Sequence, residues 1–99
     1  MDDSLSIVGL RLKKLRIERD LTMDMVVNDI YTQFNVVIRR GNLSKWENGI
    51  NIPSLYMARV MCLYYRVSLD YLLGLTDNRA PAELLANKGK KPKKDKKDK

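Results

Sequence analysis

The amino-acid sequence predicts an all-α domain built from five short helices. Apolar residues recur three and four positions apart along most of the chain, which is the spacing of one buried helix face. Serine and threonine stand where these patterns begin, and glycine stands where two of them end. With 99 residues, of which 44% are hydrophobic, the chain can bury one modest core, so we expect a single compact domain.

The first helix is expected from about residue 6 to residue 19. Five basic residues lie between its apolar positions, so one face is apolar and the other is charged. The apolar face is formed by Leu5, Val8, Leu12 and Leu15.

The second helix is expected to begin after Thr22, whose hydroxyl can accept a hydrogen bond from the first turn. Asp24 lies in that turn, where the helix dipole favours a negative charge. We expect the helix to end between residues 33 and 35 and to bury Val26, Val27 and Ile30.

The third helix is expected from Arg39 to Asn48, and Gly49 ends it as a C′ glycine. Before it, the β-branched run at residues 36–38 predicts an extended segment or a brief strand. The helical period places the apolar residues of this helix on one side, where we expect them to be buried: Leu43, Trp46 and Ile50.

The opposite face of the third helix is polar, and two arginines stand at the helix start. This face has no apolar side chain, one cation and several short hydrogen-bonding groups, which suits a helix that lies in a DNA groove. An ordinary solvated face is the alternative interpretation. The residues concerned are Arg39, Arg40, Gly41, Ser44, Lys45 and Asn48.

Two further helices are expected after Pro53. Ser54 is placed to cap the fourth helix, and Ser68 to cap a fifth helix from Leu69 to Leu73, which Gly74 stops. The apolar stripe of the fourth helix consists of Leu55, Ala58, Met61, Cys62 and Tyr65.

Most of the excess positive charge lies at the end of the chain. Residues 1–87 carry 11 basic and 10 acidic side chains, whereas residues 88–99 carry 8 Lys and 2 Asp. We therefore expect a folded domain at 1–77, a linker or short helix at 78–87 and a disordered Lys-rich tail at 88–99. The tail is interpreted as a solubilising segment, with nonspecific attraction to phosphate as the alternative.

Composition argues against several classes of function. The chain has no histidine and one cysteine, Cys62, so it cannot assemble a Cys/His metal cluster, a His-based triad or an intramolecular disulfide. We expect no enzymatic activity, no cofactor and no metal. No apolar run approaches the roughly 18 residues that cross a bilayer, and the N-terminus is acidic, unlike a signal peptide. We expect a cytoplasmic protein.

Four short sequence pieces occur in one order along the chain: GLRLKKLRIERDLT at 9–22, LSKWENG at 43–49, PSL at 53–55 and VSLDYLLG at 67–74. With these pieces the chain, from about residue 6 to residue 77, resembles the Xre family of helix-turn-helix regulators, which are phage-repressor-like five-helix DNA-binding domains. The resemblance implies that the second helix crosses the DNA backbone while the third enters the major groove.

Two features depart from the family pattern. The family usually has Gln after the Thr22 position, where its side chain meets a DNA phosphate, and this chain has Met23, which leaves only a backbone contact. The segment between Thr22 and Trp46 is also longer than the commonest version of the family, so a loop at 35–38 replaces the tight turn.

The resemblance assigns roles to individual residues of this sequence. Base contacts are implied for Arg40, Gly41, Asn42, Ser44 and Lys45. Phosphate contacts are implied or plausible for Arg39, Asn48, Lys13, Lys14 and the backbone of Met23. Arg16 and Glu47 match two positions that often pair, so we expect a partly buried structural ion pair between the first and third helices.

The sequence therefore predicts a regulator that binds double-stranded DNA sequence-specifically, as a repressor at a palindromic operator and as a homodimer at least on DNA. The fifth helix and residues 78–86, with Leu84 and Leu85, are the candidate dimer contacts. One alternative is a protein-interaction module of the antitoxin or anti-repressor type, which the substitution at Met23 favours. The other is a nonspecific nucleic-acid binder that uses the basic tail.

Overall fold

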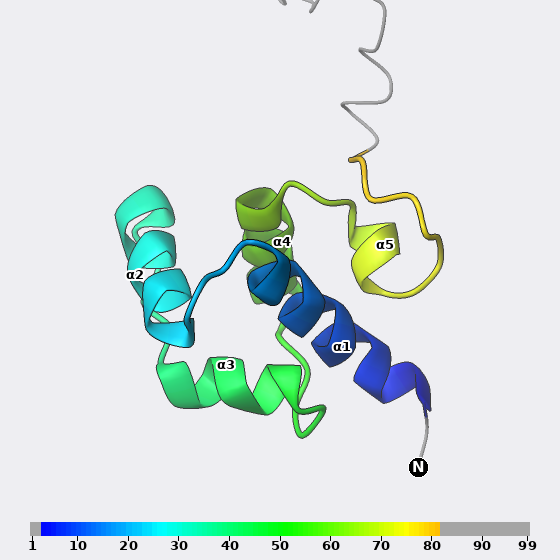
Figure 1. The fold of residues 1–99 in the computed structure, drawn as a ribbon, viewed down its shortest axis with the longest axis horizontal. Coiled ribbons are helices and arrows are strands. Elements are labelled where there is room, and N and C mark those ends of the chain that lie inside the picture. Colours follow the sequence, from blue (N-terminus) through cyan, green and yellow to red (C-terminus); the bar gives the residue numbers. More distant parts are fainter. Residues whose placement is uncertain (1–2, 82–99) are drawn as a thin grey trace, which may run out of the picture.

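Five α-helices and no strand are present in residues 3–81, the part of the chain that the computed structural model describes, with side chains from Ile7 onward. Figure 1 shows α1 running diagonally across the molecule, with α3 to its lower left, α5 to its upper right and α2 at the left, above the start of α3. The all-α prediction with five helices is confirmed. The helices are α1 (Asp3–Glu18), α2 (Met23–Phe34), α3 (Arg40–Glu47), α4 (Leu55–Tyr65) and α5 (Leu69–Leu72).

Three hydroxyl side chains begin helices as the sequence predicts. Thr22 accepts a hydrogen bond from the Met25 amide at 3.1 Å, and Ser54 accepts one from the Met57 amide at 3.1 Å. Ser68 accepts one from the Tyr71 amide at 2.9 Å. Each bond satisfies an amide that has no partner within its own helix, which explains why these helices start where they do.

Helix ends differ from prediction by small amounts. α1 begins at Asp3, three residues earlier than expected. α3 is one residue shorter at each end, and α5 ends at Leu72 rather than Leu73. Residues 35–39 connect α2 to α3 without a regular element, so the alternative of a brief strand is wrong.

The core lies where α1, α2, α3 and α4 meet, and α5 closes one side of it. Two residues expected on buried stripes are instead exposed: Ile50 at 68% and Leu55 at 78%. α3 ends at Glu47 and Gly49 takes a left-handed φ of 74°, so Ile50 leaves the helical face. Leu55 is the first residue of α4 and projects beyond the core. The largest fully buried side chains are Leu12, Leu15, Ile30, Leu43, Met61, Tyr65 and Leu72.

The chain after α5 returns to α1. Arg79 forms two hydrogen bonds with Glu18, both at 2.8 Å, and the amide of Ser68 donates to the Arg79 carbonyl at 2.7 Å. Residues 78–81 are thus held against the domain, whereas the rest of the predicted linker and the Lys-rich tail lie outside the described residues.

Candidate nucleic-acid interface

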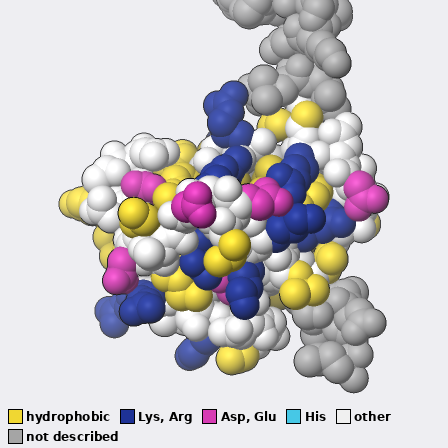
Figure 2. All heavy atoms as spheres, viewed as in Figure 1, with side chains coloured by type: hydrophobic (Ala, Val, Ile, Leu, Met, Phe, Trp, Pro, Cys, Tyr) yellow, Lys and Arg dark blue, Asp and Glu magenta, His cyan; other side chains and the backbone are white. Residues whose placement is uncertain are grey.

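The inner side of α3 is fixed in the core and its outer side is open to solvent. Leu43, Trp46 and Glu47 are buried, while the side chains at positions 40, 42, 45 and 48 are exposed and Ser44 is half-buried. In Figure 2, Lys and Arg side chains lie along the edge occupied by α3 and, in a larger group, toward the middle of the same face. The polar face predicted from the sequence is therefore presented to solvent.

A close approach between α1 and α3 depends on Gly9. A Cβ atom at this position would lie 2.2 Å from the carbonyl oxygen of Trp46 and 2.9 Å from that of Glu47. Both neighbours are backbone atoms of the last turn of α3, which cannot move aside as a side chain can. Only glycine allows this contact, so Gly9 helps to set the position of α3.

An ion pair also holds α3 against α1. Nε of Arg16 donates to one carboxylate oxygen of Glu47 at 2.8 Å, and Nη2 donates to the other at 2.9 Å. Nη1 of Arg16 donates to the Leu21 carbonyl at 2.8 Å, which ties the same guanidinium to the start of the turn before α2. The hydrogen bond with Glu47 raises the pKa of Arg16 above its ordinary value. Both residues are buried, more completely than the partial burial that the sequence suggested.

Arg40, the first residue of α3, lies beside the first turn of α2. Its Nε atom is 3.9 Å from a carboxylate oxygen of Asp24, and both side chains are largely exposed. An exposed ion pair at this separation is weak, so the guanidinium is free to turn toward a ligand. The sequence predicts for Asp24 only an interaction with the helix dipole of α2. No local sequence pattern places its carboxylate next to Arg40, sixteen positions later.

The start of α3 has open space on its outer side. Arg39 precedes the helix in an extended conformation and makes no capping hydrogen bond with its side chain. A Cβ atom on Gly41 would meet no atom within 4 Å, so nothing in the described fold requires glycine there.

The end of α3 uses Asn48 internally. Its Nδ2 donates to the carbonyl of Ser44 at 2.9 Å and lies 3.3 Å from the Ser44 hydroxyl. Both amide hydrogens are therefore used within this turn, although the side chain remains exposed. This local bond links two of the predicted contact residues and was not foreseen.

The remaining predicted contacts are less closely grouped. Met23 is half-buried and packs against the core, but it is the first residue of α2, where the backbone amide has no partner within the helix. Lys13 is exposed on α1. Lys14 lines a depression with Tyr71 and Asp77 on the α5 side of α1, so the structure does not bring it to α3.

Other chemistry finds no support in the described part of the chain. Residues 3–81 contain no group of three or more His, Cys, Asp or Glu side chains able to hold a metal ion. No helix among them is both long and apolar enough to cross a membrane. Burial raises the pKa of the Cys62 thiol to about 11, so it is a poor nucleophile at neutral pH.

Comparison with known proteins identifies the fold. A model of the helix-turn-helix family HTH_3 matches residues 12–72, which include α2, α3, α4, α5 and the C-terminal part of α1. Searches of curated proteins and of solved structures returned no significant match. Because the family match covers more than half of the chain and the five helices agree with it, the chain belongs to the Xre-like helix-turn-helix family of DNA-binding transcriptional regulators.

Proposed function

We propose that this protein binds double-stranded DNA sequence-specifically by placing α3 in the major groove, and that it acts as a repressor by occupying an operator. The observation that carries the proposal is the division of α3 into two faces. Its inner face is held by the core, by Gly9 and by the Arg16–Glu47 pair, while its outer face is polar and exposed. A rigid helix with an open polar face suits base readout.

Within this proposal Arg40 is the main base-reading residue. Its planar guanidinium matches the O6 and N7 acceptors of guanine, and a good bidentate contact of this kind typically contributes about 1–3 kcal/mol of discrimination. Gly41 allows the helix backbone to approach the base edges, since the structure shows free space beside it. Asn42, Ser44 and Lys45 follow on the same exposed side and are the further candidates for base contacts.

Phosphate contacts then fix the position of the domain on the duplex. The free amide of Met23 at the start of α2, the guanidinium of Arg39 and the side chain of Asn48 surround the base-reading residues. Lys13 is a further candidate on α1. Lys14 is the weakest of the predicted phosphate contacts, because it lies on the α5 side of α1.

A symmetric dimer is the working unit that we propose on DNA. One domain of this size covers a limited DNA surface, and two domains on half-sites about 34 Å apart read a palindrome. Repression follows from occupation of such a site. Within the described residues, α5 and the chain that follows it supply the candidate contact surface.

Selection of binding sites from a random pool of double-stranded DNA tests the proposal. The selection is run at near-physiological salt on the wild type, on Arg40→Ala and on Arg59→Ala, which removes an exposed arginine from α4 instead of α3. We expect a palindromic motif whose guanine preference is relaxed only by Arg40→Ala. If folded wild-type protein enriches no motif, sequence-specific regulation by this chain is wrong.

A further inference from the structure

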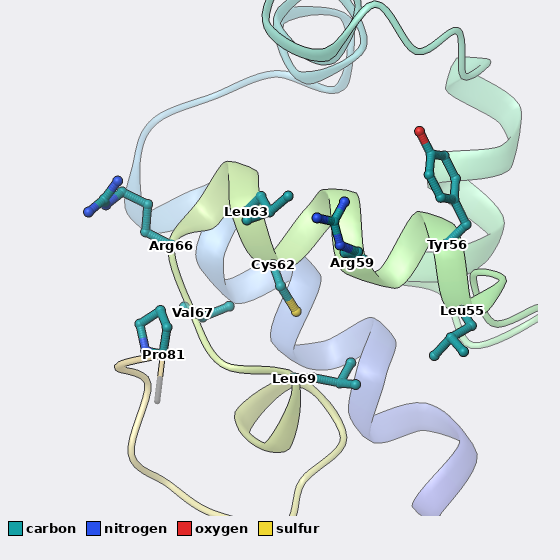
Figure 3. A pocket seen from close by; sticks show the side chains of 9 residues that line it. All are labelled: Leu55, Tyr56, Arg59, Cys62, Leu63, Arg66, Val67, Leu69 and Pro81. Carbon is teal, nitrogen blue, oxygen red and sulfur yellow. The ribbon is translucent and has the colours of Figure 1, made fainter. Parts of the chain in front are cut away.

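An apolar groove lies along α4 and α5, on helices other than the one proposed to read DNA. It has a volume of about 580 Å³. Figure 3 shows Pro81 beside Val67 near one end, Leu55 and Tyr56 at the other, and the sulfur of Cys62 directed into the space between them. The apolar lining is formed by Leu55, Cys62, Leu63, Val67, Leu69 and Pro81. We call this the α4–α5 groove.

The groove exposes large apolar side chains that the described fold leaves uncovered. Leu55 is 78% exposed, Tyr56 59% and Leu63 48%. Contiguous apolar surface of this kind on a small domain marks a place where another group binds. The core does not need these side chains, since Tyr65, Met61 and Leu72 already fill it.

The position of the last described residue indicates what the occupant is. Pro81 is the last described residue and itself lines the groove. The sequence continues as Ala82-Glu83-Leu84-Leu85-Ala86, and no apolar residue other than Pro92 follows before the end of the chain. Three residues span up to about 10 Å, so Leu84 can reach the middle of the groove along α4, whose 11 residues extend for about 16 Å.

Charge supports the same occupant. Arg59 and Arg66 belong to the groove lining, and neither pairs with a carboxylate among residues 3–81. Glu83 is the one acidic residue between Asp77 and Asp95 in the sequence. It stands two residues beyond Pro81, directly before the two leucines, where it can approach one of these arginines.

We propose that residues 82–86 dock in the α4–α5 groove of their own chain, with Leu84 and Leu85 covering the apolar lining and Glu83 next to an arginine. The groove is thereby a binding site for a segment of the same chain. This inference does not depend on α3 reading DNA, because the groove and the face of α3 are built from different helices. It does remove Leu84 and Leu85 from the candidate dimer contacts.

Cys62 provides a direct test because it is the single cysteine of the chain and lines the groove. The full-length variant Leu84→Cys is equilibrated in a buffer of reduced and oxidised glutathione, and the effective concentration of the new thiol toward Cys62 is measured. Docking in the same chain yields an intramolecular disulfide, seen by intact mass and by non-reducing electrophoresis.

Two double variants distinguish specific docking from the high local concentration that tethering alone gives to the new thiol. Both keep the same number of residues between Pro81 and the cysteine introduced at position 84. In Leu84→Cys/Leu85→Asp the remaining apolar anchor is lost, and we expect the effective concentration to fall at least tenfold. In Leu84→Cys/Asn87→Asp the same charge is added outside the docking segment, and the value should stay within twofold of Leu84→Cys alone. Equal values for all three variants would overturn the proposal.

The type of disulfide formed also shows whether the groove is filled by its own chain or by a second copy. Disulfide-linked dimers in place of intramolecular disulfides, increasing with protein concentration, would mean that the segment fills the groove of a second copy. That result contradicts docking within one chain. The DNA site selection is unaffected by either outcome, so failure here is separable from failure of the proposed function.

Discussion

Glu47, the last residue of α3, receives two hydrogen bonds from the guanidinium of Arg16 on α1, at 2.8 and 2.9 Å, and both residues are buried. A carboxylate at the negative end of a helix dipole is unfavourable unless a cation compensates it. The pair therefore joins the end of α3 to α1 and fixes the direction in which the exposed face of α3 points.

Removing one partner of this pair should destabilise the domain strongly. In Arg16→Met a buried carboxylate is left without its cation, and breaking a buried pair in this way typically costs about 3–5 kcal/mol. In Arg16→Met/Glu47→Leu no uncompensated charge remains, so we expect most of the loss in unfolding free energy to be recovered. Urea denaturation of the two variants and the wild type measures this. A loss below about 1 kcal/mol in the single variant would show that the pair is not energetically important.

The contact between Glu18 and Arg79 should make stability depend on pH. The hydrogen bond from Arg79 lowers the pKa of Glu18 below its ordinary value in the folded state. A lowered pKa means that the contribution is present above the unfolded value and is lost as the pH falls through the folded value. We expect Glu18→Gln to be less stable than the wild type at pH 7 and equally stable near pH 2. Denaturation curves at both pH values test this, with Asp20→Asn as an acidic-residue control from the same turn.

Asp24 should weaken DNA binding by competing for Arg40. Its carboxylate lies 3.9 Å from Nε of Arg40, and it adds a negative charge to the first turn of α2, where a phosphate is proposed to approach. Exposed pairs contribute about 0.2–1 kcal/mol, so Asp24→Asn should raise affinity for the selected site by up to about fivefold at low salt. The gain should shrink as salt is added.

Asp70→Asn is the matched control for this prediction. It removes the same charge from the first turn of α5, away from α3. Fluorescence anisotropy with a labelled duplex measures both variants. An equal gain in both would mean that overall charge, not competition for Arg40, is responsible.

Local signals in the sequence were sufficient for the helices but not for the contacts between them. Thr22, Ser54 and Ser68 bond to amides three residues away, so their roles can be inferred from neighbouring residues alone. The helical period of α3 does not continue past Gly49, where the backbone turns left-handed, so Ile50 does not lie on the buried face that the spacing predicts. The end of the helix at Glu47, and not the spacing, decides which side Ile50 faces.

Long-range neighbours explain what the sequence could not predict about the site. The pairing of Arg16 with Glu47 was expected only through the family resemblance, because 31 residues separate them. The contact between Asp24 and Arg40 depends on the angle between α2 and α3, which the loop at 35–39 sets. The groove along α4 depends on where Pro81 returns, and no periodic pattern encodes that return.

Alanine substitutions at two glycines allow effects on the unfolding free energy to be separated from effects on DNA affinity. A Cβ on Gly41 meets nothing within 4 Å, and replacing glycine by alanine inside an exposed helix typically stabilises it by about 0.5–1 kcal/mol. Gly41→Ala should therefore raise the unfolding free energy. If the backbone of α3 approaches the bases as proposed, the added methyl group also lies in the interface, and affinity for the selected site should fall at least tenfold.

Gly9→Ala is the opposite case and serves as the control. Its methyl group would lie 2.2 Å from the Trp46 carbonyl oxygen, so α1 and α3 must separate and the unfolding free energy should fall. Urea denaturation and anisotropy titration of both variants give four values. A more stable Gly41→Ala variant with unchanged affinity would contradict the approach of this part of α3 to DNA. If Gly41→Ala were less stable than the wild type, the conclusion that a Cβ atom at this position meets no other atom would be wrong. Higher stability together with weaker binding is expected only if Gly41 serves the ligand and not the fold.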